Sequence, residues 1–223
     1  MKDLIISELS LILLVGPSSS GKSTFAKKHF LPTEIVSSDF CRAMVSNDEG
    51  SLDSNNETFE VLHCIVRQRL KKGLLTVVDA TNLRKEDRAK MVRIAREFDC
   101  LSTAIVFNLP RTTLMERNAQ RQDRQMSDKV IFQQRSLLGR SKNFKPMRRE
   151  GFRYVYSFHS EEDVEKAVVK RQQTWSHRLE ETGPFDLIGD LHGCFTELEL
   201  MLEKLGYDLK SKEVDRAFSE FKK

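Results

Sequence analysis

Residues 11–24 of the chain read LILLVGPSSSGKST. The first five residues form an uninterrupted apolar run, which predicts a buried strand. The next eight, Gly16–Ser23, match the P-loop pattern G-x-x-x-x-G-K-[ST] at every fixed position. Residues 24–30 are expected to continue as a helix. A glycine-rich turn between a strand and a helix directs several backbone N–H groups at one point, where the helix dipole also attracts an anion.

This turn is expected to hold a nucleoside triphosphate and Mg²⁺. Lys22 would reach the β- and γ-phosphate oxygens, the Ser23 hydroxyl would ligate Mg²⁺, and Thr24 is an extra donor to the α-phosphate. The predicted nucleotide-binding residues of the turn are Gly16, Ser18, Ser19, Ser20, Gly21, Lys22, Ser23 and Thr24. The alternative is a serine- and glycine-rich turn that fits the pattern by chance, and the flanking strand and helix argue against it.

Apolar runs alternate with amphipathic segments along the rest of the chain. Further strands are predicted at 34–38, 74–80, 101–107 and 152–158, and helices at 56–72, 85–98, 112–121 and 127–138. Ser160 is predicted to cap one more helix together with Asp163. This alternation predicts an α/β fold, a parallel sheet with helices on both faces. Together with the P-loop, this arrangement resembles the adenylate-kinase-like P-loop phosphotransferases. Ligands of such sheets bind at the carboxyl ends of the strands.

Two acidic residues lie at the carboxyl ends of predicted strands. Asp39 is interpreted as the general base that takes the proton of an acceptor hydroxyl, and Arg42, one turn later, as a residue that binds a phosphate or orients the acceptor. A simple helix cap is the alternative for Asp39. Asp79 resembles an acid that holds Mg²⁺ through water, or else it forms a helix-initiating turn with Thr81 and Asn82.

Positive charge is concentrated in one segment. Residues 111–153 carry twelve Lys and Arg against four Asp and Glu, a net charge of +8 in a chain whose total is +4. Arg117, Arg121 and Arg124 recur on one helical face and are interpreted as lid arginines that bind ATP and neutralise the transferring phosphoryl group. A solvated helical face is the alternative. The remaining cations suggest a polyanionic partner. Three aromatic residues of this segment are predicted to be core: Phe132, Phe144 and Phe152.

Composition argues against several other classes of protein. No apolar stretch reaches 18 residues, so neither a membrane span nor a membrane partner is expected, and the N-terminus does not have the pattern of a signal peptide. The four cysteines are widely spaced and form no C-x-x-C pair. They are interpreted as reduced thiols of a cytoplasmic protein rather than as disulfides or metal ligands.

The C-terminal part of the chain has a different pattern. Residues 180–184 are predicted to be a linker, residues 185–193 a short strand ending in a polar turn, and residues 194–205 a helix. The block Gly-Asp-Leu-His-Gly matches the opening motif of binuclear metallophosphoesterases, with Asp190 and His192 as metal ligands. Only 30 residues follow this block, and they contain no histidine or asparagine. A complete metal site cannot form from this segment alone.

Four motifs in this order resemble the kinase module of bacterial polynucleotide kinase-phosphatases, which belong to an RNA repair system. They are GPSSSGKST at 16–24, SSDFCR at 37–42, VVDATN at 77–82 and ERNAQRQDR at 116–124. The resemblance implies a kinase domain at about 1–180, with a lid at about 111–150. It also implies that residues 181–223 are a linker and the start of a metallophosphoesterase domain.

The resemblance further implies the reaction and its residues. The γ-phosphate of ATP, or of another NTP, would pass with Mg²⁺ to the 5′-hydroxyl end of RNA or DNA. Asp39 would be the general base and Arg42 its neighbour in the acceptor site. Implied partners are the phosphatase and ligase modules of the full-length enzyme and a 3′-end methyltransferase. Phosphatase and ligase activities are not expected of this chain, since those modules are missing from it. A small-molecule P-loop kinase and a non-catalytic ATP-binding module stay open as alternatives.

Overall fold

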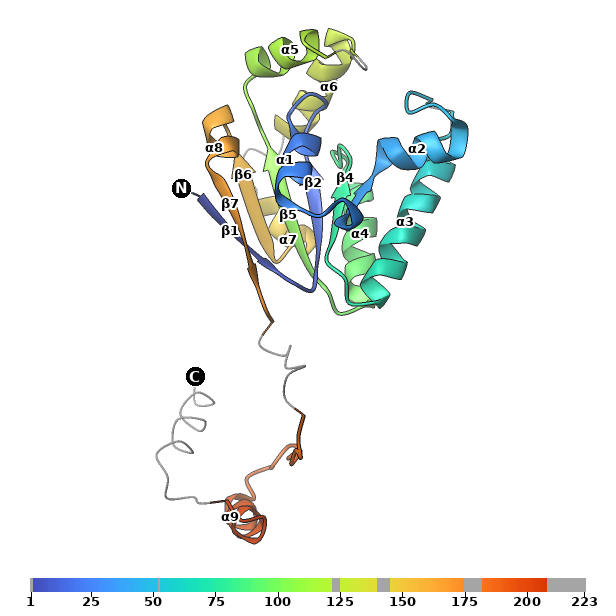
Figure 1. The fold of residues 1–223 in the computed structure, drawn as a ribbon. Helices are drawn as coiled ribbons and strands as arrows, with labels where there is room; N and C mark the ends of the chain where they lie inside the picture. Colours follow the sequence, from blue (N-terminus) through green and yellow to red (C-terminus); the bar gives the residue numbers. More distant parts are fainter. Residues whose placement is uncertain (1, 52, 122–124, 140–144, 175–181, 208–223) are drawn as a thin grey trace. The chain divides into compact units, whose positions relative to one another are not determined.

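The computed structural model describes residues 2–51, 53–121, 125–139, 145–174 and 182–207 (Figure 1). The chain divides into two compact units, Met1–His177 and Arg178–Lys223, and each is considered by itself. Within the described ranges, no helix has both the length and the apolar character needed to cross a membrane.

A five-stranded sheet forms the centre of the first unit. Its strand order is β3-β4-β2-β5-β6, and every neighbouring pair is parallel. The strands are β2 (Ser10–Val15), β3 (Ile35–Ser37), β4 (Thr76–Asp79), β5 (Leu101–Phe107) and β6 (Tyr154–Phe158). This sheet confirms the predicted α/β fold, and it places the P-loop strand β2 at the middle of the carboxyl edge.

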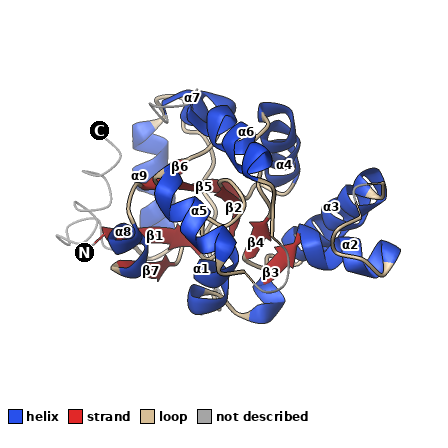
Figure 2. Ribbon diagram, turned by 90° about the horizontal axis from the view of Figure 1, so that it is seen from above, coloured by secondary structure: helices blue, strands red, loops and turns tan. Residues whose placement is uncertain are grey.

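Both faces of the sheet are covered, as Figure 2 shows. Leu11 and Leu13 of β2 pack into one hydrophobic cluster, whereas Ile12 and Leu14 pack into the other. Helices α3 (Asn55–Lys71), α4 (Lys85–Glu97) and α7 (Lys145–Glu150) supply the first cluster, and α1 (Lys22–His29) supplies the second. Because β2 is buried on both faces, its apolar run has no polar alternation.

A second, two-stranded parallel sheet was not predicted. It pairs β1 (Lys2–Ser7) with β7 (Ala167–Gln172). Leu4 and Ile6 of β1 are fully buried against the α1 side of the main sheet. The Tyr156 hydroxyl links the two sheets, since it accepts from the Ile5 N–H at 3.1 Å and donates to the Ile5 carbonyl at 2.8 Å. Strand β7 has little sequence signal, because most of its residues are partly or fully exposed.

The remaining elements of the first unit are η1 (Pro32–Glu34), α2 (Ser38–Ser46), α5 (Arg111–Ala119), α6 (Asp128–Gly139) and α8 (Glu161–Glu165). The predicted cap of α8 is confirmed, since Ser160 Oγ accepts from the Asp163 N–H at 3.1 Å and Asp163 Oδ2 accepts from the Ser160 N–H at 3.3 Å.

The prediction that Phe132 is core is wrong. This side chain is 56% exposed, and the Arg111 guanidinium carbon lies 5.5 Å from its ring centroid. Helix α6 buries Ile131 and Leu138 instead, so Phe132 faces away from the core side of the helix. Phe152 is buried as predicted, and Phe144 lies outside the described residues.

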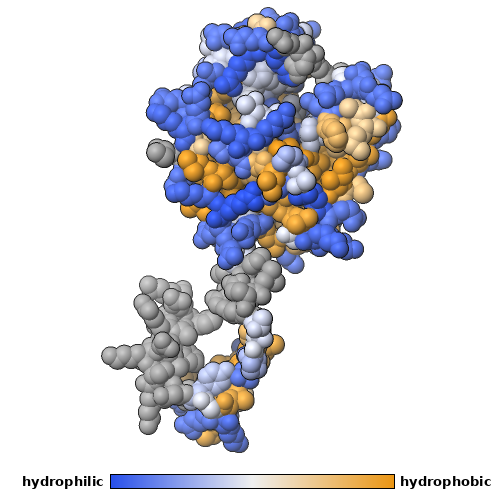
Figure 3. Space-filling model, viewed as in Figure 1, coloured by the Kyte–Doolittle hydropathy of each residue, from blue (hydrophilic) through white to orange (hydrophobic). Residues whose placement is uncertain are grey.

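The described part of the second unit contains one helix, α9 (Phe195–Lys204), which confirms the helix predicted at 194–205. The strand predicted at 185–193 is wrong. Residues 182–194 are all exposed and carry no strand assignment, because a strand needs a neighbour to receive its backbone hydrogen bonds. Large hydrophobic side chains lie exposed on this unit, among them Leu187 and Phe195 (Figure 3).

Candidate active site

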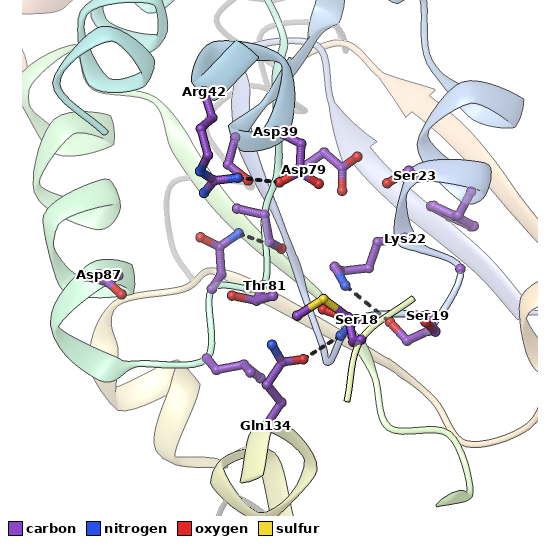
Figure 4. Close-up of a pocket in the computed structure, with 18 of the residues that line it drawn as sticks. Ser18, Ser19, Lys22, Ser23, Asp39, Arg42, Asp79, Thr81, Asp87 and Gln134 are labelled. Atoms are coloured by element: carbon purple, nitrogen blue, oxygen red, sulfur yellow. Dashed lines mark hydrogen bonds and ion pairs between the residues drawn. The ribbon is translucent and has the colours of Figure 1, made fainter. Parts of the chain in front are cut away.

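A cavity of about 1380 Å³ opens beside the P-loop and the carboxyl ends of β3 and β4 (Figure 4). All but two of the site residues predicted from the sequence line it, namely Ser18, Ser19, Ser20, Gly21, Lys22, Ser23, Thr24, Asp39, Arg42, Asp79, Arg117 and Arg121. Gly16 does not line the cavity, and Arg124 lies outside the described residues.

Glycine is required at both fixed glycine positions of the P-loop. The Gly16 N–H donates to the Thr81 carbonyl at 3.0 Å, and a Cβ on Gly16 would lie only 3.0 Å from the Phe107 backbone oxygen. Gly21 has φ of +86°, and a Cβ there would lie 2.7 Å from Arg117 Nη1. The loop is therefore closed against neighbouring strands on one side and against a lid arginine on the other.

Lys22 is buried at the floor of the cavity. Its ammonium donates to the Pro17 carbonyl at 2.6 Å and to Ser20 Oγ at 3.4 Å. Burial lowers the pKa of Lys22 from 10.5 to about 8, although the nearby Asp79 and Asp39 carboxylates oppose the change. Within the described residues the ammonium has no carboxylate at ion-pair distance, and the phosphates of a triphosphate would supply such a partner.

Asp79 and Ser23 present oxygen atoms side by side. Asp79 ends β4, is 7% exposed, and has a pKa raised by burial but held back by a hydrogen bond from Ser23 and the charge of Lys22. No cluster of three or more His, Cys, Asp or Glu that could hold a metal ion exists within the part of the chain that is described. A carboxylate and a hydroxyl nevertheless fit Mg²⁺, which completes its octahedron with substrate phosphates and water.

The turn after β4 is formed by Asn82 rather than by Asp79. Asn82 has φ of +48°, and its Nδ2 donates to the Leu14 carbonyl at 2.8 Å. The Asp79 carboxylate is therefore not needed for this turn.

Asp39 lies in the first turn of α2, but Ser37 caps that helix. Ser37 Oγ accepts from the Phe40 N–H at 3.3 Å. Asp39 Oδ1 instead accepts from Arg42 Nη1 at 2.7 Å (Figure 4). The Asp39 side chain is 57% exposed, whereas that of Arg42 is 8% exposed. A buried cation thus holds an accessible carboxylate at the cavity.

Arg42 is fixed from three directions. Besides Asp39, its Nη1 donates to the Glu49 carbonyl at 3.0 Å and its Nη2 to Asn55 Oδ1 at 3.3 Å. Its Nε is buried and has no hydrogen-bond partner among the described residues. Asn55, the first residue of α3, was not predicted as part of the site, and no motif marks it.

Two of the three predicted lid arginines, Arg117 and Arg121, line the cavity beside the P-loop. Arg117 Nε forms an ion pair with Glu161 Oε1 of α8 at 2.7 Å, an acid that the spacing within α5 could not reveal. Arg121 lines the cavity and is close enough to Lys22 to contribute to its lowered pKa. Together these positions allow α5 and the residues just after it to bring positive charge to a bound triphosphate.

Two lid residues that were not predicted as site residues, Gln134 and Asn118, also contact the P-loop. Gln134 Oε1 of α6 accepts from the Ser18 N–H of the P-loop at 2.7 Å (Figure 4). Asn118 is buried, and it accepts from the Met126 N–H at 2.9 Å and donates to the Met126 carbonyl at 2.8 Å. Asn118 therefore ties α5 to the segment that leads into α6.

Three comparisons with known proteins bear on this site. The chain is 26% identical over 194 residues to transcription factor bHLH140 of Arabidopsis thaliana, covering 85% of this chain and 19% of that protein. It is 29% identical over 123 residues to L-seryl-tRNA(Sec) kinase of Methanococcus maripaludis, covering 50% and 46%. A structure of the Pnkp1/Rnl/Hen1 RNA repair complex matches with a TM-score of 0.54 at 26% identity, covering 62% and 47%.

The chain thus spans less than half the length of each of these relatives. The sequence pattern of the AAA_33 family, described as an AAA domain, matches residues 11–147. This match covers the P-loop, both strand-end aspartates and the lid helices α5 and α6. The chain therefore belongs to the AAA_33 family, with the site of a kinase-like P-loop phosphotransferase.

Proposed function

We propose that this chain transfers the γ-phosphoryl group of ATP to the 5′-hydroxyl end of RNA or DNA. The observation that carries the proposal is the Asp39–Arg42 pair, which opens into the same cavity as Lys22 and Ser23. A donor site alone would also suit an ATP-binding module without chemistry. An accessible carboxylate held at that donor site by a buried arginine suits transfer to a hydroxyl.

In the proposed reaction, the oxygen of the 5′-hydroxyl attacks the γ-phosphorus, and Asp39 accepts the proton that this hydroxyl loses. The bond from the γ-phosphorus to the bridging oxygen breaks, and ADP leaves with the electron pair. Lys22, Arg117 and Arg121 stabilise the charge that spreads over the transferring group. Mg²⁺, held by Ser23 and through water by Asp79, would supply further charge neutralisation when bound.

The relatives support a nucleic-acid acceptor. One of them is by name a kinase of a seryl-tRNA, and another is part of an RNA repair complex. The family resemblance and this complex together support an RNA repair role, with ligase and methyltransferase partners. By the same proposal, residues 1–180 are the kinase domain with its lid at about 111–150, and residues 181–223 are a linker and the start of a phosphatase.

The test is transfer of labelled phosphate from ATP to an oligonucleotide with a 5′-hydroxyl. Asp39→Ala should lower kcat by about 10²–10⁴-fold, the range for loss of a general base. Asp53→Asn is the matched control, because Asp53 is an exposed acid outside the cavity. Nucleosides and small alcohols serve as competing acceptors.

Each outcome separates one of the alternatives. No transfer to oligonucleotides by the wild type, together with transfer to a small alcohol, would identify a small-molecule kinase. ATP binding without transfer to any acceptor would identify a non-catalytic module. Full transfer by Asp39→Ala would remove Asp39 from the mechanism while leaving the activity in place.

A further inference from the structure

The cavity continues beyond the P-loop, between α3 and α4. Its volume of about 1380 Å³ exceeds the roughly 300–1,000 Å³ typical of a pocket for one small ligand. The lining residues on this side come from α3, from α4 and from the residue just before α4. They are Asn55, Asn56, Phe59, Glu60, His63, Arg84, Asp87, Lys90 and Met91. We refer to this part of the cavity, lined by these residues, as the α3–α4 trough.

A row of three residues on α3 leads away from the acceptor end of the site. Asn55, Phe59 and His63 recur at every fourth residue, so they share one face and each lies about 6 Å further along the helix axis. The row begins at Asn55, which holds the Arg42 guanidinium. The rings of Phe59 and His63 lie with their centroids 6.2 Å apart, tilted by 42°. Phe59 therefore stands about one helical turn from the Arg42 anchor.

The facing side of the trough is formed by α4. Met91 lines the cavity and is 1% exposed, so it belongs to the buried apolar wall on this side of the trough. Lys90 is exposed, and the structure gives it no ion pair within the described ranges. Asp87 also faces the cavity (Figure 4), as an acceptor for an amino or hydroxyl group.

Charge and burial act together on His63. Burial and the nearby Lys90 and Arg67 lower its pKa, and Asp87 opposes them. The lowered pKa favours the neutral form of the His63 ring, and Lys90 and Arg84 supply the positive charge of the trough. The charge of Lys90 acts on His63, so Lys90 of α4 lies near the aromatic pair of α3.

An aromatic ring, an apolar surface and a free lysine match a base that carries a phosphate. Stacking on an aromatic ring binds any base, because every base has a π-face. A lysine ammonium binds a phosphate as a point charge. We propose that the α3–α4 trough binds the 5′-terminal nucleotide of a single-stranded acceptor, with its base against Phe59 and its 3′-phosphate on Lys90. This inference rests on the proposed function and names what its acceptor site recognises.

Binding is measured first without ATP, by fluorescence anisotropy of a short 5′-hydroxyl oligonucleotide labelled at its 3′ end. Phe59→Leu keeps an apolar side chain against the core, where Phe59 packs, and removes the ring. It should weaken binding about tenfold, whereas Phe59→Tyr should stay within about twofold. Lys90→Ala should also weaken binding about tenfold, and Lys90→Arg should restore it. Lys72→Ala, an exposed lysine outside the cavity, is the control.

The KM for transfer is then compared between a nucleoside and its 3′-monophosphate. The wild type should prefer the monophosphate about tenfold, and Lys90→Ala should abolish this preference while the KM for ATP stays unchanged. Equal use of nucleoside and monophosphate by the wild type would overturn the phosphate assignment. Unchanged oligonucleotide binding in Phe59→Leu and Lys90→Ala, or no binding by the wild type, would overturn the proposal that the trough binds the acceptor.

The two proposals fail in different ways. If Phe59→Leu and Lys90→Ala both transfer phosphate with an unchanged KM for the acceptor, the proposed acceptor-binding role of the trough is rejected and the proposed kinase activity is retained. If oligonucleotide binding depends on Phe59 and Lys90 but no acceptor is phosphorylated, the proposed binding role of the trough is retained and the proposed kinase activity is rejected. Thermal unfolding of each variant checks that the loss is not one of folding.

Discussion

Raising the pH from 7 to 9 should weaken the binding of ATP, because Lys22 loses its proton in the free protein over this range. Its pKa is lowered to about 8, first by burial and also by the charge of Arg121. The ammonium hydrogen-bonds to the Pro17 carbonyl at 2.6 Å, which compensates only part of the lost hydration. A triphosphate would bring several negative charges to the same position.

The direction of this pH effect follows from the pKa values of Lys22 in the free protein and in the ATP complex. Bound phosphates favour the charged form and raise its pKa toward the ordinary value of 10.5. Affinity is therefore fully present below pH 8 and falls as the pH rises through 8. Above pH 8 the dissociation constant should increase about tenfold per pH unit, which is about 1.4 kcal/mol at pH 9.

Isothermal titration calorimetry in two buffers of different ionisation enthalpy measures both the affinity and the protons taken up. ATP binding should take up about half a proton at pH 8 and nearly one at pH 9. Lys22→Arg is the control, since a guanidinium stays charged throughout and its binding curve should be flat. A wild-type affinity that is equal at pH 7 and 9, or binding without proton uptake, would refute the reasoning from burial.

Three other predictions concern single residues. Arg88→Met should lower the free energy of unfolding, measured by urea titration, by about 3–5 kcal/mol. The reason is that the Glu150 carboxylate, which accepts from Arg88 at 2.7 and 2.8 Å, would remain buried and unpaired. A second change, Glu150→Leu, should recover most of this loss. Gln134→Ala should speed hydrogen exchange of the Ser18 amide about fivefold in the ligand-free protein, as expected for one lost hydrogen bond, and unchanged exchange would contradict the lid contact. Asp79→Asn should raise the Mg²⁺ concentration needed for half-maximal activity. In the wild type this concentration should rise as the pH falls, because the raised pKa of Asp79 lets a proton compete with the metal. A Mg²⁺ requirement of the wild type that does not change with pH would contradict this.

The donor half of the site could be predicted because its determinants are local. One stretch of sequence contains the buried strand β2, the turn and the start of α1, and each step is fixed by the residue types present. Asp39 and Asp79 were predicted for a related reason. Parallel strands bring their carboxyl ends to one edge, so a residue that follows a strand has a known place before its contacts are known.

Contacts between distant segments could not be predicted. The hydrogen bond from Ser18 to Gln134 joins residues 116 positions apart, and Gln134 lies in a helix where several other polar residues fit the sequence equally well. Glu161, the partner of Arg117, belongs to a different helix. Strand β7 was not predicted for a different physical reason. Only Ala167 of this strand is buried, so the sequence does not show the period-2 alternation that indicates a strand.

The two halves of the candidate site are held by different kinds of structure. The P-loop is fixed by backbone geometry and by two glycines whose replacement would strain the loop, so the proposed donor half depends on the sheet. The proposed acceptor half depends on one buried side chain, because Arg42 connects Asp39 of α2, the Glu49 carbonyl and Asn55 of α3. A lysine at this position could not reproduce this set of contacts, since it lacks the planar fork whose two terminal nitrogens donate to different partners. Changes along α3 should therefore alter acceptor binding while nucleotide binding is preserved, so acceptor and nucleotide affinities can be separated by mutation.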